Sequence, residues 1–198
     1  MLDCTFGGGN HSFKLLQAHP NLRVLGLDLD SRVMEKCREQ YSDLIAQKRL
    51  ALEHSNFVHA SSIDPKSAFK KRIGVKEKFD IALLDLGFSS YQLESRDRGF
   101  SYIGPDDQPL DMRFDSERDT QEQALASDII NHSSEMELSE IFKKFGEERF
   151  HDQLAKKVVE SRNRQGMILT TGDFKNVIRD GFSNSARDEK NSMIKRAF

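Results

Sequence analysis

The sequence predicts an α/β fold with a parallel sheet, followed by a helical region, and two observations support this. First, a short strand-like run at residues 2–4 is followed by three glycines, Gly7 to Gly9, and then by a helix-like segment. Strand, glycine turn and helix is the arrangement by which α/β proteins bring backbone close to a cofactor. Second, the later apolar runs at residues 23–28 and 79–85 each end in an aspartate, which is consistent with buried parallel strands.

The composition is that of a globular protein with a highly charged surface. The chain has 198 residues, enough for one domain and a second small one, with 37% hydrophobic and 31% charged residues. The net charge of −2 provides no global basic field, so nucleic-acid binding would depend on local patches. Cys4 and Cys37 argue against a disulfide framework and suit a reducing compartment. No apolar run is long enough to span a bilayer, and the first residues lack the basic region and apolar core of a signal peptide.

The glycine turn is suited to a negatively charged ligand. Glycine permits positive φ and leaves no Cβ in the way of a ligand, and the start of the following helix offers free N–H groups. An ordinary tight βα turn is the alternative interpretation of this segment taken alone. Asp28 ends the second strand about 20 residues further on, the offset at which an acid reaches a ribose hydroxyl. Asp30 or Ser31 is instead expected to cap the next helix.

The next segments alternate between helix and strand. Apolar residues at helical spacing predict a helix from about residue 31 to residue 47, with Cys37 as a small core residue. A third strand is expected within residues 52–60, centred on residues 57–59. The basic stretch at residues 70–72 lies in a polar connector and is interpreted as a solvated face rather than a phosphate site.

The fourth strand, residues 79–85, ends in Asp85 and a turn that contains Ser89 and Ser90. In open α/β sheets, ligands lie outside the carboxyl ends of the strands, near the topological switch point. The glycine turn, Asp28 and Asp85 are therefore expected to converge on one crevice. Because these three signals stand at matching strand ends, together they indicate a binding site more strongly than any one of them.

The second half of the chain changes character. Residues 94–118 are turn-rich and charged, with aromatic and apolar residues mixed in, which favours a functional loop over disorder. After residue 120 the apolar period is helical, and Ser134 with Glu137 matches a capping box. The stripes expected to form the core are Leu138, Ile141, Phe142 and Phe145, then Phe150, Leu154 and Val158, then Phe174, Val177 and Ile178. Lysines and arginines occupy the other faces, either as a solvated surface or as a local RNA-facing patch.

Four motifs, whose order and spacing cover nearly the whole chain, resemble those of one enzyme family. They are Asp3–Ser12, Leu83–Leu93, Arg98–Ser101 with Pro109–Arg113, and Gly146–Phe150. In these motifs the chain resembles the MraW-type bacterial methyltransferases of small-subunit ribosomal RNA, which methylate N4 of a cytidine, and their mitochondrial relatives.

The resemblance implies a class I S-adenosylmethionine (SAM) methyltransferase, with a Rossmann-like, doubly wound sheet and an α-helical insert domain that helps to hold RNA. It divides the chain into a SAM-binding domain at residues 1–93, a substrate loop at 94–118 and a helical insert at 119–198. The sheet is expected to be partial, with about four parallel strands. Family members begin before the first strand and continue well past Phe198, so the chain is expected to match the family's first two-thirds.

The resemblance also implies roles for individual residues. The residues expected to bind SAM are Gly7, Gly9, Asn10, His11, Asp28, Asp85 and Gln92. Among them, Gly9, Asn10 and His11 would contact the methionine end, and Asp28 would hold the ribose. The catalytic candidates are Asp85, Ser89, Ser90 and Asp111. The residues expected to contact substrate RNA are Arg98, Phe100, Arg113 and Arg149.

This sequence departs from the family pattern at three places. Asn10 stands where a glycine is usual, and Tyr91 stands where a proline is usual. The family also uses a residue after its third strand, usually a phenylalanine, and the third-strand prediction places this position in residues 59–63.

The chemistry of the implied reaction suits these residue types. The exocyclic amine of cytosine is a poor nucleophile because its lone pair is delocalised, so its attack on a methyl group needs a close, in-line approach. An acceptor bound to the amine N–H favours that geometry and takes up developing positive charge, and the candidates are Asp85 and the turn at Ser89–Ser90. Asp111 and Arg113 would shape the cytidine pocket or brace the loop. The target base must be unpaired or swung out of its stack. No metal is expected, because the histidines and cysteines show no ligand spacing.

Two alternatives from other functional classes remain at this level. A nicotinamide oxidoreductase would need glycine at the position of Ser12. A truncated, non-catalytic RNA- or protein-binding remnant of the family is the more serious alternative. The expected partner is small-subunit ribosomal RNA or the assembling small subunit, with no membrane involved and with the oligomeric state, a homodimer included, left open. The expected compartment is the cytoplasm of a bacterium or the mitochondrial matrix, and neither a secreted nor a membrane location.

Overall fold

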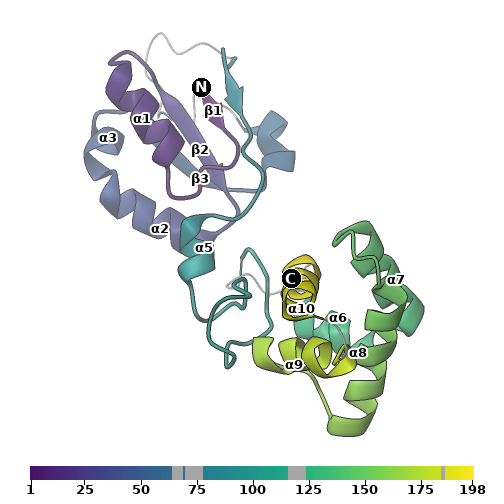
Figure 1. Ribbon diagram of the computed structural model, residues 1–198. Coiled ribbons are helices and arrows are strands. Elements are labelled where there is room, and N and C mark those ends of the chain that lie inside the picture. The colour runs from purple at the N-terminus through teal and green to yellow at the C-terminus, as the bar shows by residue number, and fades with distance from the viewer. Residues whose placement is uncertain (64–68, 70–77, 116–123, 184–185) are drawn as a thin grey trace. The chain divides into compact units, whose positions relative to one another are not determined.

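Figure 1 shows the computed structural model of the chain, which describes residues 1–63, 69, 78–115, 124–183 and 186–198. The chain forms two compact units, Met1–Tyr91 and Gln92–Phe198, called unit 1 and unit 2 below. The basic stretch Lys70-Lys71-Arg72, expected to be a solvated connector, lies outside the described residues.

Unit 1 is built on a four-stranded parallel sheet. Its strands are β1 (Leu2–Asp3), β2 (Val24–Asp28), β3 (Leu50–His54) and β4 (Ala82–Leu83), in the order β3-β2-β1-β4. The chain proceeds outward from β1 through β2 to β3 and then returns to the other side of β1. The strand order therefore reverses between β1 and β4, and such a switch point is where ligands bind in doubly wound sheets. The predicted Rossmann-like arrangement of about four parallel strands is confirmed.

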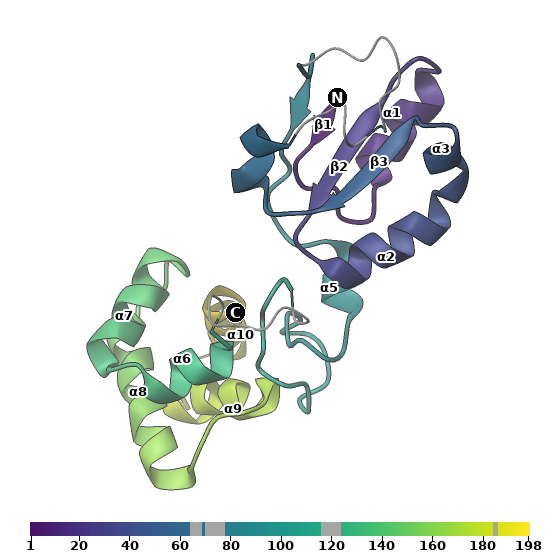
Figure 2. The same ribbon diagram turned by 180° about the vertical axis from the view of Figure 1, so that it is seen from behind.

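Two apolar layers enclose this sheet. The helices that pack on one face are α1 (Asn10–Ala18), α2 (Ser31–Gln40) and α3 (Ser42–Ala46). α1 lies over the face turned to the viewer in Figure 1, and Figure 2 shows the opposite face, with β2 and β3 in front. Val24 of β2 belongs to the first layer, whereas Leu25 and Leu27 belong to the second. Because side chains of a strand point alternately to its two faces, the continuous apolar run of β2 fills both layers.

The third strand lies earlier in the chain than the sequence predicts. β3 ends at His54, which pairs with Asp28 of β2, and the next residues form a 3-10 helix, η1 (Phe57–Ser62). The side chain of Asn56 accepts a hydrogen bond from the N–H of Val58 and caps this helix. Centring the strand on residues 57–59 was therefore wrong. Aromatic and β-branched residues favour strands in general, but here a capping side chain decides the local conformation.

Two further elements differ from the prediction in length. The helix expected from residue 31 to residue 47 is interrupted at Tyr41, whose φ of −107° and ψ of 24° separate α2 from α3. The strand expected at residues 79–85 pairs with β1 only at Ala82 and Leu83. Since β4 stands at the edge of the described sheet, it has a neighbouring strand on one side only, and Ile81 and Leu84 are exposed.

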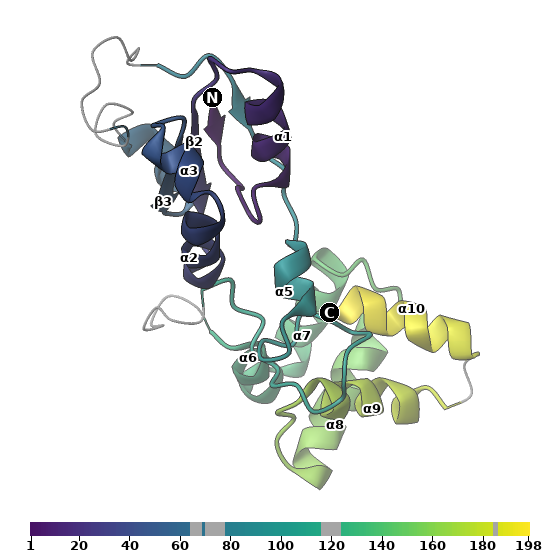
Figure 3. The same ribbon diagram turned by 90° about the vertical axis from the view of Figure 1, so that its left-hand side faces the viewer.

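Unit 2 contains the expected helical region. Its helices are α6 (Ala126–His132), α7 (Glu135–Lys144), α8 (His151–Gln165), α9 (Thr171–Gly181) and α10 (Arg187–Ala197), and the short α5 (Ser90–Glu94) lies where the two units meet in the sequence. α7 packs against α8, and α9 contacts both α8 and α10 (Figure 3). The capping box predicted at Ser134 and Glu137 is present at the start of α7.

The predicted apolar stripes supply most of the core of unit 2, but Phe145 and the partly buried Ile141 lie outside it. Leu138 and Phe142 of α7, Leu154 of α8 and Phe174 of α9 are all buried in one cluster. Phe145 is instead 74% exposed, so its assignment to the core was wrong. Phe145 is the C-cap of α7, and at the end of a helix the helical spacing no longer fixes which side chains face the core.

The loop at residues 98–113 is an ordered part of unit 2 and is bound to the start of α9. The N–H of Gly172 donates to the carbonyl of Asp106 over 2.7 Å. The buried ammonium group of Lys175 donates to the carbonyl of Gly104 and to the carboxylate of Asp106, at 3.0 and 2.9 Å. These bonds satisfy donors of the first turns of α9 and hold the loop in place.

Candidate functional site

The three glycines of the turn after β1 differ in what they allow. Gly7 and Gly9 have positive φ values of 51° and 76°, which residues other than glycine seldom adopt. A Cβ atom on Gly9 would lie 2.6 Å from the ring of Phe6, so packing also requires glycine there. A Cβ atom on Gly8 would meet no atom of the residues that the structure describes within 4 Å, apart from its chain neighbours. The outer side of the turn at Gly8 is therefore open to a ligand.

Hydrogen bonds join the glycine turn to the ends of two other strands. The N–H of Gly7 donates to Oδ2 of Asp28, at the end of β2, over 2.6 Å. The N–H of Asp85, just after β4, donates to Oγ1 of Thr5 over 2.8 Å. The structure thus brings the glycine turn, Asp28 and Asp85 together at the carboxyl edge of the sheet, beside the switch point.

Asp28 has a half-buried carboxylate with several donors around it. Its Oδ1 accepts the N–H of Asp30 over 2.9 Å, in addition to the bond from Gly7. Burial raises the pKa of Asp28, while the hydrogen bonds from Asp30 and Gly7 oppose that rise. Since each carboxylate oxygen accepts more than one hydrogen bond, Asp28 fixes the turn and retains acceptor capacity for a ligand hydroxyl. Asp30 caps α2 through the N–H of Val33, as predicted.

A second buried carboxylate, that of Asp3, lies near the site, and the sequence analysis did not predict it as a site residue. Its Oδ2 accepts a 2.5 Å hydrogen bond from the hydroxyl of Ser12 on α1, and its Oδ1 accepts the N–H of Thr5. Asp3 is 1% exposed, and burial raises the pKa of its carboxyl group. These contacts hold the first turn of α1 against β1. An aspartate at a strand end is the signal that identified Asp28 and Asp85, and it could have identified Asp3.

His11 and Asp85 stand at the exposed side of this edge. Nδ1 of His11 lies 3.7 Å from the Asp85 carboxylate, and both side chains are 65% exposed. α1 begins at Asn10 and has no acidic residue in its first turn. The N–H groups and the positive end of the helix dipole there are therefore suited to an anionic ligand.

The other candidates of this group follow Asp85 in the sequence. Ser89 lies beside the turn, because a Cβ atom on Gly7 would be 3.5 Å from the Cβ of Ser89. Ser90 begins α5, and Gln92 is a buried residue at the start of unit 2. Unit 1 therefore brings together one group of predicted site residues, which comprises Gly7, Gly9, Asn10, His11, Asp28, Asp85 and Ser89.

The corrected position of β3 changes which residue follows this strand. Phe57 comes three residues after His54, the last residue of β3, and its side chain is 39% exposed. The chain there stays close to the site, since the N–H of Ser55 donates to the carbonyl of Asp28 over 3.0 Å. Phe57 is therefore the phenylalanine that follows the third strand, where residues 59–63 were expected.

Four predicted site residues of unit 2 make contacts within that unit. Arg98 is 1% exposed, donates to the carbonyl of Phe114 over 3.1 Å and lies over the ring of Phe100, which is also buried. Asp111 and Arg113 form a bidentate pair, with N–O distances of 2.7 and 2.8 Å. In this conformation Arg98 and Phe100 do not face solvent, and the Asp111–Arg113 pair braces the loop.

Arg149 stands on a turn between α7 and α8 that is held by an ion pair to α10. The buried carboxylate of Glu148 accepts hydrogen bonds from the Arg196 guanidinium of α10 at 2.7 Å. A Cβ atom on Gly146 would lie 2.3 Å from the carbonyl oxygen of Arg196, so the turn packs directly on the backbone of α10. Arg149 itself is exposed, and it is the one predicted RNA contact that lies fully on the surface.

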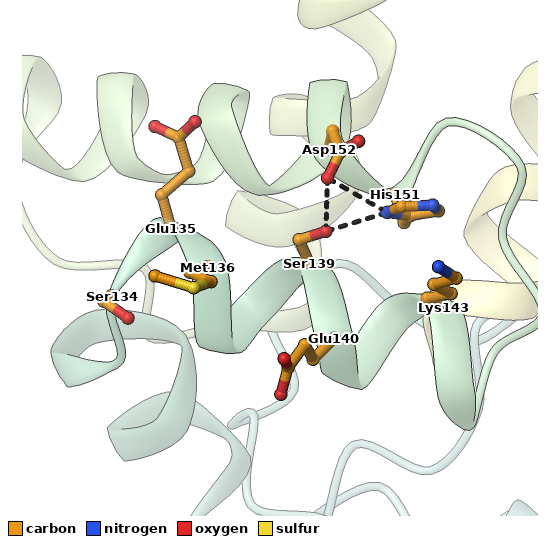
Figure 4. A pocket seen from close by; sticks show the side chains of 8 residues that line it. All are labelled: Ser134, Glu135, Met136, Ser139, Glu140, Lys143, His151 and Asp152. Carbon is orange, nitrogen blue, oxygen red and sulfur yellow. Dashed lines mark hydrogen bonds and ion pairs between the residues drawn. The ribbon is translucent and has the colours of Figure 1, made fainter.

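A pocket of unit 2, lined mostly by polar residue types, lies outside the sequence-based prediction. It has a volume of about 660 Å³ and is lined by Ser134, Glu135, Met136, Ser139, Glu140, Lys143, His151 and Asp152 (Figure 4). The Oγ of Ser139 lies 2.7 Å from Nδ1 of His151 and donates to Asp152 over 2.5 Å. Nδ1 of His151 also faces Asp152, whereas a nucleophilic triad needs its two partners on different ring nitrogens. The cluster therefore joins α7 to α8 and is not arranged for nucleophilic catalysis.

Neither a metal centre nor a membrane span is found in the part of the chain that the structure describes. Within these residues, no group of three or more His, Cys, Asp or Glu side chains could hold a metal ion. No helix among them combines the length and the apolar character that a membrane crossing requires.

The family model of the MraW methylases matches residues 1–198, which is the whole chain. The chain belongs to the MraW methylase family. Its relatives in this family include proteins named ribosomal RNA small subunit methyltransferase H. That of Lactobacillus gasseri is 34% identical over 100% of this chain, that of Thermosipho melanesiensis 38% over 90%, and that of Thermobifida fusca 36% over 100%.

These alignments cover 59%, 54% and 55% of the three relatives, so the chain spans a little over half the length of the MraW proteins it matches. The methyl donor of MraW methylases is SAM. The carboxyl edge of the sheet in unit 1 fits this cofactor, because Gly8 leaves an open space beside the turn and Asp28 offers acceptor oxygens.

Proposed function

We propose that this MraW-family chain carries the SAM site, and part of the RNA-binding surface, of an enzyme that methylates N4 of a cytidine in small-subunit ribosomal RNA. The observation that supports this most directly is the convergence of the glycine turn, Asp28 and Asp85 at one edge of the sheet. The names of the relatives support the RNA substrate, and the sequence motifs support the cytidine N4 position.

The proposed SAM site uses groups from four segments of unit 1. The first turn of α1, with Asn10 and His11, would receive the methionine carboxylate. Asp28 would accept hydrogen bonds from the ribose hydroxyls. Phe57 would offer its exposed ring to the adenine. The open side of Gly8 leaves room for the ligand against the turn.

Bound SAM supplies a methyl group on a positively charged sulfur. The contribution of this chain would be to hold the cytosine amine in line with that group at close range. Asp85, which is exposed beside His11, would accept an amine N–H and stabilise the positive charge that develops on the nitrogen. Ser89 and Ser90 would add acceptors in the same turn.

On the RNA side, the proposal relies on Arg149 and on the braced loop of unit 2. Residues 92–198 contain 17 lysines and arginines against 21 aspartates and glutamates, so unit 2 has no overall basic field. RNA contact through unit 2 would therefore be local. Arg149 would bind a phosphate, while Asp111 and Arg113 would brace the loop.

Calorimetric titration of the chain with SAM tests the cofactor site. Asp28→Ala should weaken SAM binding by about ten- to a hundredfold, because hydrogen bonds to a charged group contribute about 1.5–3 kcal/mol. Glu53→Ala, which removes an exposed carboxylate from β3, is the matched control and should bind SAM as the wild type does. Unchanged affinity in Asp28→Ala would exclude this residue from the site.

Transfer of a labelled methyl group from SAM to small-subunit ribosomal RNA, followed by nucleoside analysis, tests the reaction. The expected product is N4-methylcytidine, and Asp85→Ala should lose transfer even when SAM is saturating. A product methylated at another atom would refute the proposed specificity, and normal turnover by Asp85→Ala would refute its role. Retention of RNA without any uptake of SAM would support the non-catalytic alternative.

A further inference from the structure

α2 holds the glycine turn through two hydrogen bonds to backbone carbonyls of the turn. The hydroxyl of Tyr41, at the end of α2, donates to the carbonyl of Gly8 over 2.7 Å. The thiol of Cys37 donates to the carbonyl of Gly7 over 3.4 Å. These two carbonyls belong to the two peptide groups that flank the Cα atom of Gly8, so α2 fixes the turn on both sides of that residue.

The direction of the Gly8 N–H follows from these bonds. In a trans peptide the N–H points opposite to the carbonyl, so a Gly7 carbonyl held toward α2 directs the Gly8 N–H away from α2. The N–H of Gly7 is used by Asp28 and that of Gly9 by the carbonyl of Phe6. The Gly8 N–H has no hydrogen bond to another residue in the described ranges, and the space around Gly8 is open.

Tyr41 is well suited to fix the turn. Its side chain is 5% exposed, and its ring contacts those of Phe6 and Phe13, with centroid distances of 6.1 and 5.4 Å. The interruption between α2 and α3 falls at this residue. Burial raises the pKa of Tyr41, so its hydroxyl stays protonated and remains a donor.

We propose that Tyr41, assisted by Cys37, is a positioning residue for the cofactor: it orients the glycine turn so that the Gly8 N–H faces the carboxylate at the methionine end of SAM. This inference rests on the proposed function and deepens it. Tyr41 would not touch the cofactor itself, because its hydroxyl is already bound to the carbonyl of Gly8. It would act only through the backbone of the glycine turn.

The test removes a single oxygen atom. Tyr41→Phe deletes the hydroxyl and keeps the ring, and Tyr102→Phe makes the same change in unit 2 as a matched control. Calorimetry gives the affinity of each variant for SAM and for 5′-methylthioadenosine, which keeps the adenosine and the sulfur but lacks the amino-acid carboxylate. Tyr41→Phe should weaken SAM binding about three- to tenfold, the effect of one hydrogen bond, and should change 5′-methylthioadenosine binding by less than about twofold.

The choice of ligands separates positioning from a general structural role. If Tyr41→Phe weakens both ligands equally, or leaves SAM affinity unchanged, the positioning role is overturned. Cys37→Ser keeps a donor and should bind SAM like the wild type, whereas Cys37→Ala should weaken the binding of SAM but not of 5′-methylthioadenosine. Weaker SAM binding by Cys37→Ser than by Cys37→Ala would also count against the inference. A wild-type chain that binds neither ligand would overturn the proposed function itself. SAM binding by the wild type with unchanged affinity in Tyr41→Phe would overturn the positioning role alone.

Discussion

Gly8 and Gly9, two neighbouring residues of the glycine turn, are glycines for different reasons. Gly9 is required by the fold, because its φ is positive and a side chain would collide with Phe6. Gly8 is free of both constraints, since it is not among the positive-φ glycines of the described residues and a Cβ atom there would meet none of their atoms within 4 Å, chain neighbours aside. A residue that the fold does not require to be glycine, in a turn open to solvent, is explained by the space that a ligand needs.

Gly8→Ala should therefore leave the fold intact and weaken SAM binding. The melting temperature should stay within about 3 °C of the wild type, while the added methyl group should lower SAM affinity by about tenfold or more. Thermal unfolding and calorimetry measure the two effects. Gly9→Ala is the contrasting variant, and its strained φ and collision with Phe6 should cost about 2–4 kcal/mol of unfolding free energy. SAM binding by Gly8→Ala at wild-type strength would place the ligand elsewhere.

The buried carboxyl group of Asp3 should make stability depend on pH. Burial raises its pKa above the ordinary value of 3.8, so the folded chain binds this proton more tightly than the unfolded chain. The stabilisation from this group is complete below that ordinary value and is lost as the pH rises through the window up to the raised value. In urea unfolding between about pH 4 and about pH 7, the wild type should lose more stability than Asp3→Asn does. Parallel curves for the two proteins would show that the folded-state pKa is not raised.

At the scale of elements, the turn at residues 146–150 shows a motif that serves mainly packing. Gly146 allows close approach to α10, Glu148 is paired with Arg196, and Phe150 packs against the core of unit 2. Arg149 is the member of this turn that is left exposed with a positive charge. The packing of its neighbours therefore fixes the place from which this cation is presented to solvent.

Arg196→Met should destabilise unit 2 by leaving the Glu148 carboxylate buried without its charged partner. We expect a loss of about 2–3 kcal/mol of unfolding free energy, at or below the lower end for buried pairs because the Arg196 side chain is 30% exposed. Urea unfolding measures this, with Arg187→Met, an exposed arginine of the same helix, as the control. Adding Glu148→Gln should restore part of the stability, since a neutral amide is less costly to bury. A loss no larger than that of the control would show that the pair does not contribute.

At the scale of the whole molecule, SAM binding is assigned to unit 1, and the phosphate contact of the RNA is assigned to unit 2. The residues proposed to hold SAM lie in unit 1, and Arg149 lies in unit 2. Variants that affect one ligand should therefore leave the direct affinity for the other largely unchanged, as expected for sites that share no residues.

Arg149→Gln should weaken RNA binding and leave SAM affinity unchanged. Loss of one phosphate contact should also reduce the slope of log affinity against log salt concentration by about one. Fluorescence anisotropy with a single-stranded fragment of small-subunit ribosomal RNA, at several salt concentrations, measures both quantities. Arg164→Gln, an exposed arginine at the end of α8, is the control. An unchanged slope in Arg149→Gln would remove this residue from the RNA surface.

The sequence by itself determined the fold class, the family and the meeting place of the proposed SAM-binding groups. These follow from short patterns: a glycine turn after a strand, and aspartates at the ends of apolar runs. Parallel strands place their carboxyl ends at one edge, so local patterns at Gly7–Gly9, Asp28 and Asp85 are enough to predict that these groups lie together.

Only the tertiary structure decided where β3 ends, that Arg98 is buried, that Phe145 is exposed, and that Tyr41 holds the glycine turn. Each of these depends on contacts that the local sequence does not encode. Tyr41 and Gly8 are 33 residues apart, and their bond arises because α2 packs on the same face of the sheet as Phe6, which precedes the turn. Burial and long-range hydrogen bonds are properties of packed surfaces, so they become visible only when the whole chain is folded.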